Sequence, residues 1–86
     1  MTMLRGRERV ESSDSTFDEM YRSELASMIA LGLLMTGSKE TALDLANEAM
    51  LRAFRNWPSV SLMDRPGAWV RRVLINLAID QRRHAP

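Results

Sequence analysis

Apolar residues between Ser38 and Pro58 recur at helical spacing, and this pattern constrains the fold more than any other feature of the chain. Intervals of three and four residues place apolar side chains on one face of an amphipathic helix. The residues of this face are Ala42, Leu45, Ala46, Ala49, Met50, Ala53, Phe54 and Trp57. Ser38 suits the N-cap, and Pro58 is expected to end the helix at Trp57, because the residue before a proline avoids helical backbone angles.

A second apolar stripe precedes this helix and predicts another helix that runs to Thr36, before Gly37. Its members are Phe17, Met20, Tyr21, Leu25, Met28, Leu31 and Met35. Residues 14–16 offer cap chemistry for its start, and Gly32 leaves open a break within it. Only Gly37 and Ser38 join the two helices, which must therefore be antiparallel neighbours. Residues 1–14 show no sustained period, so we predict a flexible tail there and a helical domain over 15–84.

The segment 66–83 combines an apolar helical face with a polar one. At 100° per residue, the apolar arc collects Val70, Val73, Leu74, Leu77 and Ala78. The opposite arc carries Trp69, Arg72, Asn76, Asp80 and Arg83, with Arg71 and Arg82 on its flank. Pro66 suits the first turn of a helix, and Asp64 is the expected cap before it. Residues 58–65 are predicted to form a loop.

Alternation between apolar and polar residues with the period of two, typical of strands, is absent from the sequence. We therefore predict an all-α fold, a small bundle of three to four helices. The content of 45% hydrophobic and 27% charged residues is typical of a globular domain. No apolar run approaches the roughly 20 residues of a membrane span, and no signal peptide is recognisable. Because cysteine is absent as well, we expect a cytoplasmic protein.

The outward face of the helix after Ser38 places a leucine beside two carboxylates. Asp44, Asn47, Glu48 and Leu51 stand at positions i, i+3, i+4 and i+7, followed by Arg52 and Arg55. This composition favours a helix-in-groove contact with a basic, partly apolar protein. A merely solvated helix face is the alternative interpretation, since single exposed apolar residues are common.

The polar edge of the last helix brings an indole, a side-chain amide and several guanidinium groups within reach of one ligand. Residues 58–86 carry five arginines and two aspartates, a local net charge of +3. Trp69 is suited to stack on a base or sugar, Asn76 to bond a base edge, and the arginines to pair with phosphates. The alternative is that Trp69 belongs to the core and the arginines only solubilise the helix.

Enzyme chemistry has little support in the sequence. His84, the only histidine, lies at the C-terminus without a neighbouring nucleophile. The sequence contains no phosphate-binding loop, no dinucleotide motif and no cluster of metal ligands. We therefore expect a binding protein that uses no catalytic residue, metal or cofactor.

Several motifs occur together in the order of a known family. They are Phe17-x-x-x-Tyr21, Thr36-Gly37, the run Ala42-Leu43-Asp44-Leu45-Ala46-Asn47-Glu48-x-x-Leu51-Arg52-Ala53-Phe54-Arg55-x-Trp57, and Pro66-x-Ala68-Trp69-Val70-x-Arg72-Val73-x-x-Asn76-Leu77-Ala78-Ile79-Asp80-x-x-Arg83. Over residues 16–84 the chain resembles region 2 of the extracytoplasmic-function (group 4) sigma factors of bacterial RNA polymerase. It departs from the usual D-L-V-Q-E motif of that family at Ala46 and Asn47.

The resemblance implies a domain that binds core RNA polymerase and captures the melted minus-ten element of promoter DNA as a single strand. Docking on the clamp helices of the beta-prime subunit would use Asp44, Asn47, Glu48, Leu51, Arg52 and Arg55. Reading of the non-template strand would use Ser61, Leu62, Met63, Asp64, Arg65, Trp69, Arg72, Asn76 and Arg83. The loop over 59–65 would hold a flipped-out base.

Two further expectations come with the resemblance. Family members are often held inactive by an anti-sigma factor, and they carry a second helical domain, so we expect an inhibitor protein and a longer factor of which this chain is a part. The alternative function is a helical protein-interaction or regulatory module that resembles a sigma domain without promoter-opening activity.

Overall fold

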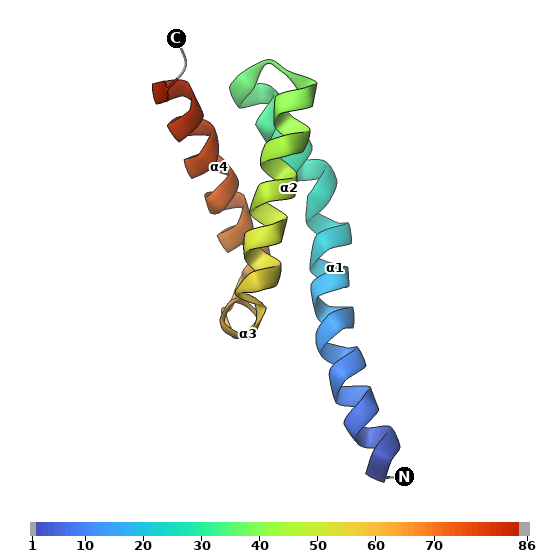
Figure 1. Ribbon diagram of the computed structural model, residues 1–86. Helices are drawn as coiled ribbons and strands as arrows, with labels where there is room; N and C mark the ends of the chain where they lie inside the picture. Colours follow the sequence, from blue (N-terminus) through green and yellow to red (C-terminus); the bar gives the residue numbers. More distant parts are fainter. Residues whose placement is uncertain (1, 85–86) are drawn as a thin grey trace.

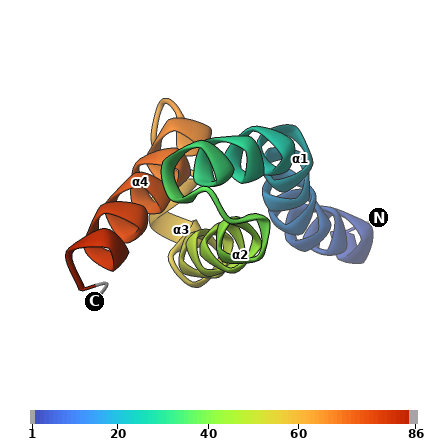
Figure 2. The same ribbon diagram turned by 90° about the horizontal axis from the view of Figure 1, so that it is seen from above.

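The computed structural model describes the backbone of residues 2–84 and the side chains of residues 16–84. In this part of the chain it has no strand and four helices, which are α1 (Thr2–Thr36), α2 (Lys39–Arg55), α3 (Trp57–Val60) and α4 (Pro66–His84). The three long helices run alternately up, down and up, and each packs against the other two (Figure 1, Figure 2). The short α3 lies at the end of the bundle where the chain runs from α2 to α4. The predicted all-α bundle is confirmed.

Helix α1 ends where the sequence predicts and begins much earlier. Gly37 adopts a φ of 72°, which favours glycine, and its N–H donates to the Leu33 carbonyl at 2.7 Å, closing the helix. The helix extends back to Thr2, so the predicted start at residues 14–16 is wrong. Aspartate, serine and threonine also occur inside helices, because each lowers helix stability by only about 0.7 kcal/mol or less relative to alanine. Their presence at residues 14–16 therefore does not require the helix to begin there. The predicted flexible tail falls on residues 1–14, whose side chains lie outside the described part.

Gly32 does not break α1; it lets α2 come close. The helix is continuous through this position, and Gly32 is buried. A Cβ atom built on Gly32 would lie 3.1 Å from the Cβ of Ala42, tighter than ordinary contact. The two-residue connection makes α1 and α2 antiparallel, as predicted (Figure 1).

Helix α2 begins at its predicted cap and ends two residues early. The Ser38 hydroxyl accepts a hydrogen bond from the Thr41 N–H at 3.2 Å, which confirms the N-cap. Asn56 leaves helical geometry (φ −108°, ψ 17°), and its side-chain amide donates to the Arg52 carbonyl at 2.8 Å. Trp57 and Pro58 therefore open α3 rather than closing α2. The predicted loop over 58–65 is correct only after Val60.

The start of α4 corrects one further expectation. Pro66 is the first helical residue, as predicted. The Trp69 N–H donates to the Arg65 carbonyl at 3.2 Å, so Arg65 and not Asp64 stands at the N-cap. A proline at the first helical position identifies where a helix begins, but it does not determine which side chain caps that helix.

The core lies between α1, α2 and α4 and is built around the small residues of α2. Four alanines of α2 are at most 1% exposed, namely Ala42, Ala46, Ala49 and Ala53. The larger side chains that fill the space around them include Met28, Val60, Val70 and Leu74, all fully buried, and Trp57 at 5% exposed. In α4 the predicted apolar arc is confirmed, with Val73 and Leu77 half-buried at its border.

Phe54 belongs to the predicted apolar face of α2 and is nevertheless 55% exposed. It follows the buried Ala53 by one residue, and a step of about 100° carries its side chain to the border of the apolar stripe. The rings of Phe54 and Phe17 pack edge to face with centroids 5.1 Å apart, and the Phe17 ring packs in the same way on Trp57 with centroids 5.3 Å apart. None of the helices in the described residues combines the length and apolarity of a membrane span.

The burial difference between two leucines gives a test of this core. Leu74→Ala should lower the free energy of unfolding by about 2–5 kcal/mol, because Leu74 is fully buried. Leu34→Ala, the same substitution at a side chain that is 83% exposed, should change it by about 0.5 kcal/mol or less. Urea unfolding followed by circular dichroism measures both, and equal losses would contradict this packing.

Candidate functional site

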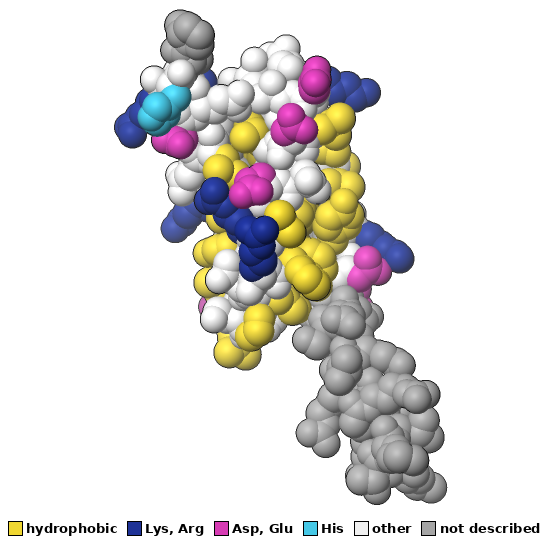
Figure 3. Space-filling model, in the orientation of Figure 1, with side chains coloured by type: hydrophobic (Ala, Val, Ile, Leu, Met, Phe, Trp, Pro, Cys, Tyr) yellow, Lys and Arg dark blue, Asp and Glu magenta, His cyan; other side chains and the backbone are white. Residues whose placement is uncertain are grey.

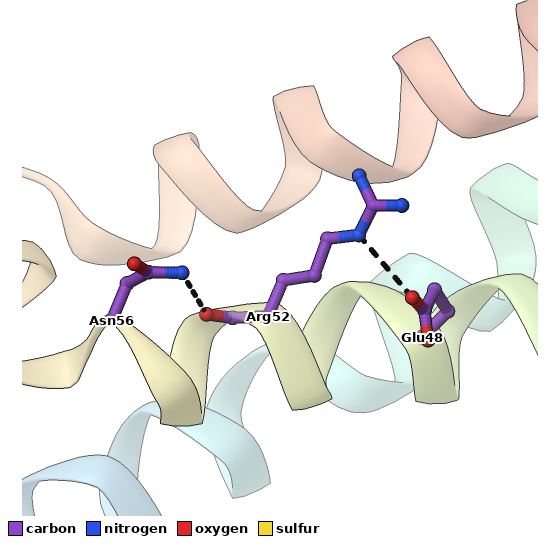
Figure 4. A network of polar contacts seen from close by, with 3 residues as sticks. All are labelled: Glu48, Arg52 and Asn56. Atoms are coloured by element: carbon purple, nitrogen blue, oxygen red, sulfur yellow. Dashed lines mark hydrogen bonds and ion pairs between the residues drawn. The ribbon is translucent and has the colours of Figure 1, made fainter.

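The outward face of α2 changes from acidic to basic along the helix. Asp44, Asn47 and Leu51 are exposed and Glu48 is half-buried, while Arg52 and Arg55 are exposed in the last turn. Arg52 Nε donates to Glu48 Oε1 at 3.3 Å (Figure 4). Both side chains are more than 40% exposed, so this ion pair adds little to stability and leaves both groups open to a partner.

An apolar hollow of about 330 Å³ lies between α1 and α2 next to this face. Its apolar lining comes from Tyr21, Leu25, Ile29, Leu43 and Ala46, and its polar lining from Asp44 and Asn47. The face on which α2 lies shows apolar side chains interspersed with a few charged ones (Figure 3). Leu43 and Leu51, at 44% and 38% exposed, belong to the apolar surface that the bundle leaves uncovered. A protein partner would gain free energy by covering it.

The polar edge of α4 is long, and only part of it is free. Arg72, Asn76 and Arg83 are exposed, as the helical stripe predicts. Trp69 is half-buried and packs against the core, so part of its indole belongs to the core and part is open to solvent. Arg83 follows Trp69 by 14 residues, roughly 21 Å along the axis, so these two side chains cannot share one nucleotide.

The segment 61–65 joins α3 to α4 and presents apolar side chains to solvent. Leu62 is 85% exposed and Met63 is 40% exposed, beside exposed Asp64 and Arg65, while Ser61 is half-buried. Backbone hydrogen bonds hold the turn, from Leu62 N–H to Ser59 at 3.2 Å and from Met63 N–H to Val60 at 3.1 Å. The segment thus places two large apolar side chains at the N-terminal end of α4 without burying them.

A second hollow of about 330 Å³ brings the two predicted faces together. It lies between α2 and α4 and is lined by Arg52, Val73, Asn76, Leu77 and Asp80. Arg52 belongs to the predicted protein-binding face of α2, and Asn76 belongs to the predicted nucleic-acid edge of α4. Both side chains nevertheless line this one hollow. In Figure 4 the Arg52 side chain extends from α2 in front of the α4 ribbon. The two faces are therefore neighbours and not opposite sides of the domain.

One residue beside this edge, Glu24, is not among the residues that the sequence predicts for the site. Glu24 of α1 forms an ion pair with Arg71 of α4, and the Glu24 side chain is only 18% exposed. The two residues are 47 positions apart, and helical periodicity contains no information on contacts between helices. A carboxylate beside the apolar stripe of α1 was the only available signal.

These features describe a helical bundle in which an acidic and partly apolar face of α2 adjoins an edge of α4 that carries arginines. Residues 20–85 match the family model described as Sigma-70 region 2, so the chain belongs to the sigma-70 region 2 family. This family comprises transcription initiation factors rather than known enzymes, and its region 2 takes part in binding core RNA polymerase and in promoter melting. No match to the chain was found among curated proteins or among solved structures.

Burial separates the site residues into two groups that stability measurements can distinguish. Asn76→Ala should change the free energy of unfolding by about 0.5 kcal/mol or less, because Asn76 is exposed. Trp69→Ala should cost about half of the 3–5 kcal/mol typical of a buried tryptophan, because its indole is half-buried. Trp57→Ala is the matched control and should show the full loss. Equal losses at Trp57 and Trp69 would place Trp69 wholly in the core.

Proposed function

We propose that this chain is region 2 of an extracytoplasmic-function sigma factor of a bacterial RNA polymerase. It docks on the core enzyme through α2 and captures the melted non-template strand of the minus-ten element through α4 and residues 61–65. The observation that carries this proposal is the adjacency of the two faces, which meet at the hollow bordered by Arg52 and Asn76.

Polymerase docking is supported by the composition and exposure of α2. Asp44 and Glu48 supply negative charge, and exposed Leu51 supplies apolar area beside them. A basic, partly apolar helix pair, such as the beta-prime clamp helices, complements this combination in charge and in polarity. The apolar hollow between α1 and α2 extends the same surface. An anti-sigma protein would inhibit the factor by covering it.

Strand capture is supported by the side chains around the start of α4. The exposed part of the Trp69 indole offers a stacking surface, Arg72 offers a phosphate partner, and Asn76 offers both a donor and an acceptor to a base edge. Residues 61–65 expose Leu62 and Met63, which can cover an unstacked base with apolar surface.

Melting follows from differential binding and needs no covalent step. A protein that binds single-stranded DNA more tightly than duplex shifts the opening equilibrium toward the melted state by that difference in affinity. Each stacked base contributes about 1–3 kcal/mol, which is comparable to the cost of opening one base-pair step. Because α2 and α4 belong to one packed unit, docking of α2 brings the edge of α4 to the same part of the polymerase.

Charge reversal on α2 tests the docking face. Asp44→Arg combined with Glu48→Arg should lower the affinity for core polymerase at least about 100-fold, because like charges at an interface cost several kcal/mol. The control, Asp18→Arg combined with Glu19→Arg, makes the same charge change on exposed residues of α1 and should leave affinity nearly unchanged. Capture of purified core enzyme on immobilised chain measures both. A folded wild-type chain that captures no polymerase would favour the interaction-module function.

Selection from a random pool tests strand reading without knowledge of the promoter. The chain bound to core polymerase should enrich a short motif from DNA with a randomised single-stranded segment. Asn76→Ala should relax the motif at one position, whereas Arg72→Ala should weaken binding to all sequences alike. Both variants should still capture core polymerase. Enrichment of the same motif, with the same affinity, by both variants would remove α4 from the proposed reading surface.

A further inference from the structure

An ion pair between α1 and α4 lies beside the proposed DNA-reading edge. Glu24 Oε1 accepts from Arg71 Nη1, and the two side chains are 18% and 40% exposed. The other ion pairs in the described residues join positions four apart on one helix and are more exposed at their acidic partner. Among the ion pairs of the described residues, the Glu24–Arg71 pair is thus the one that joins α4 to α1.

The Glu24 carboxylate also lies against the first turn of α4. A Cβ atom built on Gly67 would lie 2.5 Å from Glu24 Oε2 and 2.8 Å from Glu24 Cδ, so the absence of a side chain at Gly67 makes room for the carboxylate. The first turn of α4 contains no acidic residue of its own. Glu24 supplies a negative charge there from another helix, where the helix dipole favours it.

Arg71 and its neighbour Arg72 therefore have different environments. Successive residues of a helix point about 100° apart, so Arg71 turns toward Glu24 while Arg72 is exposed. A guanidinium that binds a phosphate replaces condensed counterions, and this replacement makes binding depend on salt. Because the Glu24–Arg71 pair is neutral as a whole, a phosphate at Arg71 would also meet the negative charge of Glu24, and no net charge is left to replace a counterion.

We propose that Glu24 is a positioning residue of the DNA-reading edge, which fixes the first turn of α4 and withholds Arg71 from the phosphate backbone. The inference rests on the proposed function, since it concerns how many phosphates this edge contacts. Arg72 then contacts the strand, whereas Arg71 stays paired with Glu24 and makes no phosphate contact. Loss of the Glu24 charge releases Arg71, which is sufficiently exposed to reach solvent and a bound strand.

The salt dependence of single-strand binding measures how many phosphates the chain contacts. The probe is a fluorescent single-stranded oligonucleotide of mixed sequence, and its affinity for the chain is measured over a salt series. Each phosphate contact contributes about 0.7 to the slope of log affinity against log salt. Arg72→Gln should reduce the slope by about 0.7, and Arg71→Gln should leave it unchanged. Glu24→Gln should increase it by about 0.7.

Two further variants separate positioning from charge alone. Glu24→Gln combined with Arg71→Gln has the net charge of wild type and should restore its slope. Gly67→Ala keeps both charged groups and displaces the carboxylate, since the Cβ would meet the mobile end of Glu24. It should increase the slope in the same direction as Glu24→Gln, and it serves as the test if that variant does not fold by circular dichroism.

The outcomes distinguish this inference from the proposed function. If Arg71→Gln reduces the slope as much as Arg72→Gln, or if Glu24→Gln and Gly67→Ala both leave it unchanged, the role of Glu24 is overturned and strand capture still stands. If the wild-type chain shows no salt-dependent binding, or if Arg72→Gln has no effect on the slope, strand capture by this edge fails and the inference fails with it.

Discussion

Close approach of the neighbouring helices to α2 is the constraint on which the rest of the structure depends. Four of the five buried residues of α2 are alanines, which allow close approach, and Gly32 of α1 meets Ala42 directly. The fifth buried residue is Met50. Apart from Met50, the large side chains of the core therefore come from the surrounding elements, as Met28 and Leu74 do. A larger residue in place of one of these alanines would push α1 or α4 away from α2, because a packed interior has no spare volume.

This arrangement also determines where binding chemistry can lie. With an inner face made mostly of alanines, α2 carries its charged residues on the outside, where Asp44 is exposed beside exposed Leu51. Helix α4 packs beside α2 and leaves Arg72 and Asn76 exposed. One small core thus supports two neighbouring surfaces of different chemistry, which suits a domain that contacts a protein and a nucleic acid at once.

Local signals in the sequence predicted the elements better than their ends. The Ser38 cap, the stop at Gly37 and the Pro66 start are each determined by one residue and its neighbours, and the structure confirms them. The end of α2 depends on Asn56, whose side chain bonds back to α2. Phe54 lies near the border of a stripe, where a small rotation of the helix decides between burial and exposure. Periodicity defines a stripe but not its border.

The sequence by itself determined the helical class, the inner face of each long helix and the residues available on the outer faces, because these depend on spacing within one helix. Only the tertiary structure decided which faces meet. It joined Glu24 to Arg71 across 47 residues and placed Arg52 beside Asn76. Such contacts depend on the relative position of two helices, which follows from the packing of the whole core and not from the pattern of either helix.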